Sequence, residues 1–272
     1  MNRTCSITAL LLALATTARA DVGDDLPPTT NAPAGEYAVL RGVQGPAGMF
    51  SARILLDVNL SAGQAGKPIS LAPDLFYSFT DRFQLGLVHQ GPEGWQTRPG
   101  TGLCLTGASN GCPHVYDNIG FDALYVLVFG KLDLSAHASL FFDSFDPTRE
   151  HLALGFAGKA HLSDRVAVAF DPKYGIALDD RATNDDYFIM PVELDVQAAP
   201  KTSVKLLTGL FGNVSSFSDS YQIPVGIGLV QNLNAHFDLG ARFSFDNLLG
   251  NEPMGVGRVD DRSLAVLLNI RS

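Results

Sequence analysis

Residues 132–140 read Leu-Asp-Leu-Ser-Ala-His-Ala-Ser-Leu, so apolar and polar side chains alternate at every position. A β-strand points successive side chains to opposite faces of its sheet, so this alternation predicts a strand with one apolar and one polar face. Asp133 and His137 lie on the polar face, and Leu132 and Leu140 lie on the apolar face. A sheet built from such strands separates an apolar medium from a polar one.

The same alternation recurs along the rest of the chain, for example over 151–162, 237–246 and 263–271. Most of these segments are about 9–12 residues long, which suits a tilted strand that crosses a bilayer, whereas strands of soluble proteins are usually about 5–6. The pattern predicts strands at 49–60, 68–79, 83–89, 119–129, 132–143, 151–162, 165–171, 186–197, 203–212, 221–231, 237–246 and 262–271.

The connections between these strands alternate in length. Short ones are expected at 80–82, 130–131, 163–165, 198–202 and 232–236. Longer ones are expected at 61–67, 90–118, 144–150, 172–185, 213–220 and 247–261. Short periplasmic turns and longer outer loops are typical of bacterial outer-membrane barrels, and a sheet in lipid must close because its backbone groups cannot stay unpaired. The sequence therefore predicts an all-β fold, a closed antiparallel transmembrane β-barrel of about twelve strands over residues 49–272.

The beginning of the chain has the pattern of an export signal. Arg3 supplies a positive charge, residues 7–15 are apolar, and Ala18-Arg19-Ala20 is a cleavage site, so residues 1–20 are predicted to be a signal peptide that is removed. The apolar run is much shorter than the roughly 20 residues of a spanning helix. Residues 21–48 are rich in Pro, Gly, Ala, Thr and Asp, which predicts a flexible periplasmic segment.

Charge and cysteines narrow the class of protein. The whole chain has a formal charge of −9, and removal of residues 1–20 takes away two arginines and no acid, which gives −11. Such a chain is not expected to bind nucleic acid, whose phosphates require a basic surface. Cys104 and Cys112 remain after cleavage, and in an oxidising compartment this pair is expected to form a disulfide, with two free thiols as the alternative.

The short turns repeat a pattern. Phe79-Thr80-Asp81-Arg82-Phe83 precedes one alternating segment, and Leu162-Ser163-Asp164-Arg165-Val166 precedes another. In these hairpins the chain resembles the porin-like bacterial outer-membrane β-barrel proteins. The resemblance covers roughly residues 49–272 and implies the barrel fold, a location in the outer membrane, contact with its lipid, and small solutes or ions as partners. Barrels of this group commonly end on an aromatic residue, whereas this chain ends on Ser272.

A search for catalytic groups favours a protein that is not an enzyme. His137 and Ser139 share a face with Asp133 and Asp143, but residues two apart on a strand are about 6–7 Å apart, too far for a direct bond between nucleophile and base. His137, His151 and His161 are expected to be spread along the barrel, and the acidic loop 179–186 lacks the ordered spacing of a calcium site. Neither a metal site nor a cofactor is expected.

The polar face of the strands is the remaining candidate site. The residues expected to line the lumen are Arg53, Asp57, Asp74, Asp122, Asp133, His137, His151, Lys159, His161, Glu193, Asp195, Lys205, Asp238, Arg242 and Arg271. Acids are in slight excess over the whole inner face, so an open lumen would mildly favour cations. The resulting hypothesis is a small porin-like channel for passive passage of ions or small solutes. The alternatives are a non-conducting structural or adhesive barrel that acts through outer loops such as 90–118, which holds Trp95, and an outer-membrane lipid hydrolase.

Overall fold

The structure is a computed structural model that describes residues 38–64, 66–89, 101–112, 114–146, 148–251 and 259–272. The predicted signal peptide, 1–20, and residues 21–37 lie outside the described residues. In the described ranges no helix is long and apolar enough to span a membrane.

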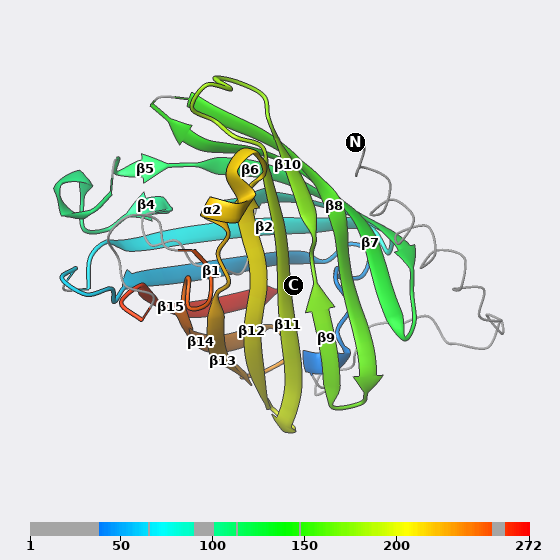
Figure 1. Cartoon of the computed structure of the whole chain (residues 1–272). Coiled ribbons are helices and arrows are strands. Elements are labelled where there is room, and N and C mark those ends of the chain that lie inside the picture. The colour runs from blue at the N-terminus through cyan, green and yellow to red at the C-terminus, as the bar shows by residue number, and fades with distance from the viewer. Residues whose placement is uncertain (1–37, 65, 90–100, 113, 147, 252–258) are drawn as a thin grey trace.

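One antiparallel sheet forms the molecule and closes on itself, because β1 pairs with β15 on one side and with β2 on the other (Figure 1). The strands of the ring are β1 (Phe50–Asn59), β2 (Ile69–Thr80), β3 (Phe83–Val88), β6 (Ile119–Val128), β7 (Leu132–Phe145), β8 (Thr148–Ser163), β9 (Val166–Phe170), β10 (Lys173–Ala177), β11 (Tyr187–Ala199), β12 (Thr202–Asn213), β13 (Val225–Asn232), β14 (Phe237–Phe245) and β15 (Arg262–Arg271). Strands β9 and β10 share one place between β8 and β11, so the described chain forms a closed 12-strand barrel, which confirms the predicted fold.

The interruption between β9 and β10 has a cause in the sequence. Pro172 has no N–H to donate to a neighbouring strand. Pro191 lies at the same level on the neighbouring strand β11, and its carbonyl accepts a hydrogen bond from Asp171 N at 3.3 Å. On the other side, β8 presents Gly155, where an added Cβ would lie 2.0 Å from the Pro172 carbonyl oxygen. Two prolines and one glycine therefore fit together at this point, and the register with β8 and β11 is the same on both sides of it.

Two of the predicted loops are wrong. Residues 172–185 were expected to be a loop, but 173–177 form β10, because the chain resumes pairing with β8 and β11 after Pro172. Residues 144–150 were also expected to be a loop, but the β7–β8 ladder passes a bulge after Phe142 and continues to the pair Phe145 and Thr148. The longer hairpin sets a register in which His137 lies opposite Gly155.

The predicted loop 90–118 contains structure in its described part. It holds β4 (Gly102–Cys104), the 3-10 turn η2 (Ala108–Asn110) and β5 (Tyr116–Asp117). Strand β4 pairs with β2 at Ser70 and Leu71, beyond the last residue of β2 that pairs with β3, and β5 pairs with β4. This segment therefore prolongs the wall at the end of the barrel that carries the longer loops.

The two faces of the wall differ in the way that the alternation predicts. Along β7, Leu132 is 40% exposed whereas the adjacent Asp133 is 3% exposed. The exposed outer face is apolar, and aromatic residues gather near the ends that carry the short turns, where Tyr77 and Phe79 pack edge to face with ring centroids 4.8 Å apart. An apolar outer face with an aromatic rim is typical of barrels that sit in a bilayer.

Candidate functional site in the barrel interior

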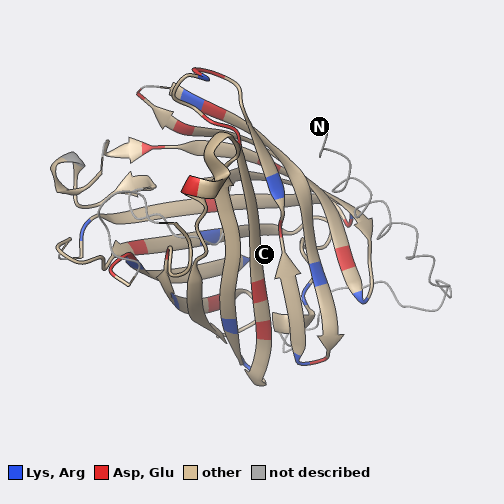
Figure 2. Cartoon of the chain, in the orientation of Figure 1, with Lys and Arg blue, Asp and Glu red and all other residues tan. Residues whose placement is uncertain are grey.

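Charged residues of both signs occur along the strands of the wall (Figure 2), and several of their side chains are buried and pair with one another. Arg53 on β1 reaches Asp74 on β2, with Nη2 2.6 Å from Oδ2, and Asp74 is completely buried. Arg271 on β15 pairs with Asp238 on β14, which is 1% exposed. Because an ion loses much of its hydration inside a protein, such carboxylates are stable only when cations or donors compensate them.

A second group of charges lies on β8, β11 and β12. Lys159 is 3.3 Å from Asp195, Lys205 is 2.9 Å from the other oxygen of Asp195, and Lys205 also pairs with Glu193. Two ammonium groups and two carboxylates thus form one network in which every charge has an opposite charge as its neighbour.

A cavity of about 270 Å³ lies beside this network. Its charged lining consists of Arg41, Arg53, Lys159, Lys205, Arg242, Glu193, Asp195 and Asp238. Arg242 differs from the other cations, because its Nε and Nη2 make no hydrogen bond within the described part of the chain. On the neighbouring strand, Gly228 lies between Arg242 and Lys205 in register, so no side chain separates these two cations on the inner face.

The residues before β1 enter the barrel. We call residues 38–48 the inner segment; it begins with the 3-10 turn η1 (Ala38–Leu40), drawn in blue beside the end of β9 in Figure 1. Val39 is completely buried, and Arg41 reaches Asp238 with Nη1 2.7 Å from Oδ2. The sequence predicted only a flexible segment here, so these contacts with the wall were not anticipated.

His137 belongs to a third group, on β6, β7 and the β9–β10 break. Its Nε2 is 2.7 Å from Asp122 Oδ1 and its Nδ1 is 2.8 Å from Asp171 Oδ1, while Lys173 Nζ is 2.8 Å from Asp171 Oδ2. The expectation that Ser139 is too far from His137 is wrong: Ser139 Oγ lies 3.3 Å from His137 Nε2. The expectation was based on the distance between Cα atoms and took no account of the length of the side chains. Both side chains turn toward Asp122.

This third group has the residue types of a hydrolase triad but not its bonding pattern. A catalytic histidine must leave Nε2 free to accept the proton of the serine hydroxyl. Here Nε2 faces the Asp122 carboxylate more closely than it faces Ser139, and the Ser139 hydroxyl donates to that same carboxylate. The arrangement therefore holds a histidine between two carboxylates rather than activating the serine.

The other predicted residues also lie on the inner face. His161 is 3.3 Å from Asp133, His151 pairs with Asp143, and Asp57 is 1% exposed. The three histidines contact different carboxylates, and the described residues contain no group of three or more His, Cys, Asp and Glu side chains that could hold a metal ion. That solutes meet these inward side chains stays a prediction.

Three participants were missed by the sequence analysis, namely Arg41, Asp171 and Lys173. Arg41 follows the apolar Ala38-Val39-Leu40 in a segment otherwise rich in small residues, which was the available signal. Asp171 and Lys173 flank Pro172 and were assigned to the end of a strand and to a loop. The register with β8 and β11 is the same before and after Pro172, so an extension of the strand's alternation past Pro172 would have placed both residues on the inner face.

The outer loop 178–186 uses its acids internally. Asp179 Oδ1 accepts from Glu150 N at 2.8 Å, and this backbone hydrogen bond, with Asn184, lowers the pKa of Asp179. Asp186 accepts from Ala177 N at 2.9 Å and pairs with Arg181 at 3.3 Å. These carboxylates hold the loop against the ends of β8 and β10.

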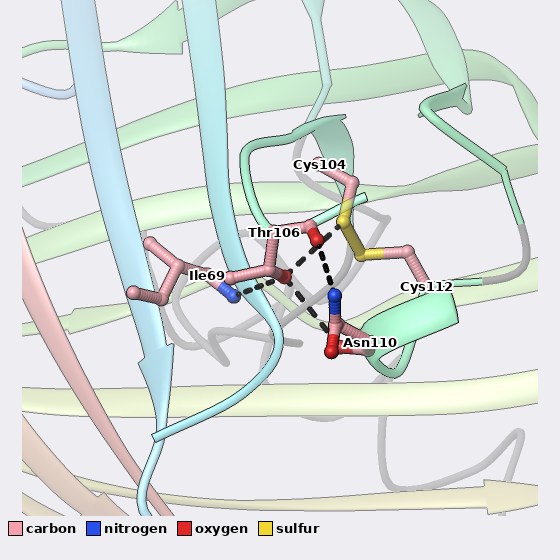
Figure 3. Close-up of a disulfide and its surroundings, with 5 residues drawn as sticks. All are labelled: Ile69, Cys104, Thr106, Asn110 and Cys112. Carbon is pink, nitrogen blue, oxygen red and sulfur yellow. Dashed lines mark hydrogen bonds between the residues drawn. A yellow bond between two sulfur atoms is a disulfide. The ribbon is translucent and has the colours of Figure 1, made fainter. Parts of the chain in front are cut away.

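The predicted disulfide between Cys104 and Cys112 is present and closes the turn around η2 (Figure 3). Inside this turn, Asn110 Nδ2 donates to the Thr106 carbonyl at 2.8 Å, and Thr106 Oγ1 accepts from Ile69 N at 3.2 Å. The disulfide therefore fixes a turn that is bonded to the start of β2. Trp95 lies outside the described residues.

Comparison with known proteins supports the fold and not a closer relationship. No family model matches the sequence, and no curated protein matches it. Among solved structures, the KdgM porin in complex with disordered oligogalacturonate is similar with a TM-score of 0.53 and 12% identity over 81% of this chain and 98% of that chain. The NanC porin is similar with a TM-score of 0.53 and 7% identity over the same shares. At these identities the likeness shows that the chain has the fold of a porin barrel.

Proposed function

We propose that this chain is a porin-like channel of the bacterial outer membrane that lets small solutes or ions diffuse across. The observation that carries the proposal is a closed barrel whose outer face is apolar and whose inner face holds paired charges around a cavity. A bilayer solvates the outer face, while the inner face offers water and ions a polar path. The fold shared with the KdgM and NanC porins supports the same function.

The charges at the cavity favour anions. Five basic and three acidic side chains line it, and Asp238, Asp195 and Glu193 are all in ion pairs. By contrast, the Nε and Nη2 atoms of Arg242 are buried and make no hydrogen bond within the described residues. The expectation of a mild cation preference counted the whole inner face, whereas this proposal counts only the side chains that line the cavity. We assign the channel to small anionic solutes.

The reversal potential across a planar bilayer in a potassium chloride gradient tests both parts of the proposal. We expect conductance steps and a reversal potential shifted toward that of chloride. Arg242→Gln should move the potential toward zero, whereas Arg165→Gln, in a short turn outside the cavity, should leave it unchanged. Oligogalacturonate, which was present with the KdgM porin, is a second probe and should reduce the conductance.

Two results would contradict the proposal in different ways. Folded protein that gives no conductance steps would exclude a channel. Steps with a reversal potential near that of potassium would retain the channel and exclude the anion preference.

A non-conducting barrel that acts through its outer loops is the second candidate. It is favoured by the disulfide-closed segment at β4 and β5, where Leu105 is 53% and Val115 is 56% exposed. Apolar side chains held in a rigid loop suit contact with a partner. This function requires a barrel that stays closed in the bilayer experiment. No enzymatic role is proposed. We expect the rate of phospholipid hydrolysis to be the same for the wild type and for His137→Ala and Ser139→Ala variants.

A further inference from the structure

We propose that the inner segment, residues 38–48, is a releasable plug that narrows the barrel at the end with the short turns. The inference rests on the proposed channel function and adds a regulatory element to it. It is based on the position of the inner segment, on the contacts that hold it, and on the groups that its release would leave on the wall.

Three strands hold the first half of the inner segment. Arg41 pairs with Asp238 on β14, the Val39 N–H donates to Gln197 Oε1 on β11 at 3.4 Å, and Lys159 Nζ on β8 donates to the Ala38 carbonyl at 3.4 Å. Val39 is completely buried between these contacts. The turn η1 is therefore fixed inside the barrel and not on its rim.

The second half of the inner segment lies against β2 and β3, on a different part of the wall. Ala47 N donates to Asp81 Oδ1 at 2.9 Å, Gly45 N donates to Gln84 Oε1 at 3.3 Å, and Gln44 donates to the Asp81 carbonyl. In the order of strands around the barrel, β2 and β3 are separated from β11 by several strands in either direction. Residues 38–48 thus cross the opening and fill part of its section.

The charged partners of the first half keep other partners without it, and of the wall groups only Gln197 Oε1 would exchange the Val39 N–H for water. Asp238 also pairs with Arg271 and accepts from Asn232 Nδ2 at 3.0 Å. Lys159 pairs with Asp195, and Gln197 donates to the carbonyls of Ala199 and Thr202. An unpaired buried charge would make release costly, and release of η1 leaves none on the wall.

Release would also change the cavity. Ala38 and Arg41 are part of its lining, so their departure opens it toward the short turns and removes one cation from it. Gly42, Gly45 and Gly48 give the segment backbone freedom between η1 and the first residue of β1. The segment remains covalently attached at Phe50, so it can return.

Single-channel conductance of two variants tests the plug. Arg41 and Arg271 bond to the same carboxylate, that of Asp238, but only Arg41 belongs to the inner segment. We expect Arg41→Ala to raise the single-channel conductance or the open fraction roughly twofold or more, since the narrowest section limits flow. Arg271→Ala, the matched control, removes an arginine from the wall and should not raise either. Equal behaviour of the two variants, with a conducting wild type, would overturn the plug and leave the channel standing.

A second measurement does not depend on conduction. In a Val39→Cys variant, with Cys104 and Cys112 joined to each other, the rate of labelling by a membrane-impermeant maleimide reports release of η1. We expect addition of Arg41→Ala to accelerate labelling several-fold and addition of Arg271→Ala to have little effect. If neither substitution accelerates labelling, the inner segment is a fixed part of the barrel and the plug is excluded. If Arg41→Ala accelerates labelling but no variant conducts, the plug stands and the channel function is excluded.

Discussion

The wall of the barrel and the inner segment are held in different ways. On β14, Phe243 lies in register between Ile227 on β13 and Leu264 on β15, so the strand belongs to a ladder on both of its sides. Among the described residues, the inner segment is backbone-bonded to a wall strand at its last residue, where Gly48 N donates to the Ser78 carbonyl at 2.7 Å. The residues before Gly48 are held by one buried apolar side chain and by polar contacts that involve wall side chains. A strand cannot leave a closed sheet in lipid without exposing unpaired backbone groups, whereas the inner segment can leave at the loss of a few contacts. The wall is therefore the scaffold of the molecule, and the inner segment is its movable part.

The largest effect is expected where the wall depends on the absence of a side chain. In Gly155→Val the new Cβ would lie 2.0 Å from the Pro172 carbonyl oxygen and 2.8 Å from Lys173 Cα, which are backbone atoms that cannot move independently. We expect the variant to lose at least about 4 kcal/mol of stability or to fail to form the barrel. Heat-modifiable mobility in gels measures this. Gly228→Ala is the control, because its Cβ has no neighbour closer than 3.5 Å, and it should fold normally.

A charge on the outer face should have the next largest effect. Ile227 is 52% exposed on β13, and Ile227→Lys should destabilise the barrel by about 2–4 kcal/mol in a bilayer, because the ammonium group would face lipid. Unfolding by denaturant in lipid vesicles gives the value. Leu233→Lys, which changes a 48% exposed residue in a short turn, should cost far less; equal losses at the two positions would argue against a membrane around β13.

Removal of the disulfide should affect only the outer end. The bridge closes a loop with a sequence separation of 8, so Cys104→Ser with Cys112→Ser should destabilise that loop by about 2–3 kcal/mol through chain entropy. Hydrogen exchange should accelerate in residues 102–117 and remain unchanged in β12 to β15. Acceleration throughout the barrel would mean that the loop is part of the scaffold.

The smallest effect is a dependence on pH at the outer ends of β14 and β15. Desolvation, together with the nearby carboxylate of Asp261, raises the pKa of Asp246 to about 7. Since this pKa is above the ordinary value of 3.8, the protonated form stabilises the fold, and that contribution is lost as the pH rises from about 4 to about 7. The protection of the amides at 245–247, corrected for the intrinsic pH dependence of exchange, should fall over this range, and Asp246→Asn should abolish the fall. Protection that does not change with pH in the wild type would contradict this assignment.

The sequence predicted the position of strands, because a strand is specified by the local alternation of apolar and polar residues. Alternation placed β7 and β14 within two residues of their observed ends because each strand must present one face to lipid along its length. Residues 172–185, which begin with Pro172, were expected to be a loop, although 173–177 pair with β8 and β11 in the sheet. The inner segment could not be placed, because Arg41 meets Asp238 across 197 positions of sequence and nothing local to Arg41 identifies that partner.

Native-state hydrogen exchange of the processed wild-type chain in lipid tests the contrast between scaffold and movable part most directly. We predict that the amides of residues 38–48 exchange together and well ahead of those of β11 and β14, to which the segment is bonded. Protection of the inner segment equal to that of β11 and β14 would contradict it, because the segment would then open only when the barrel itself unfolds.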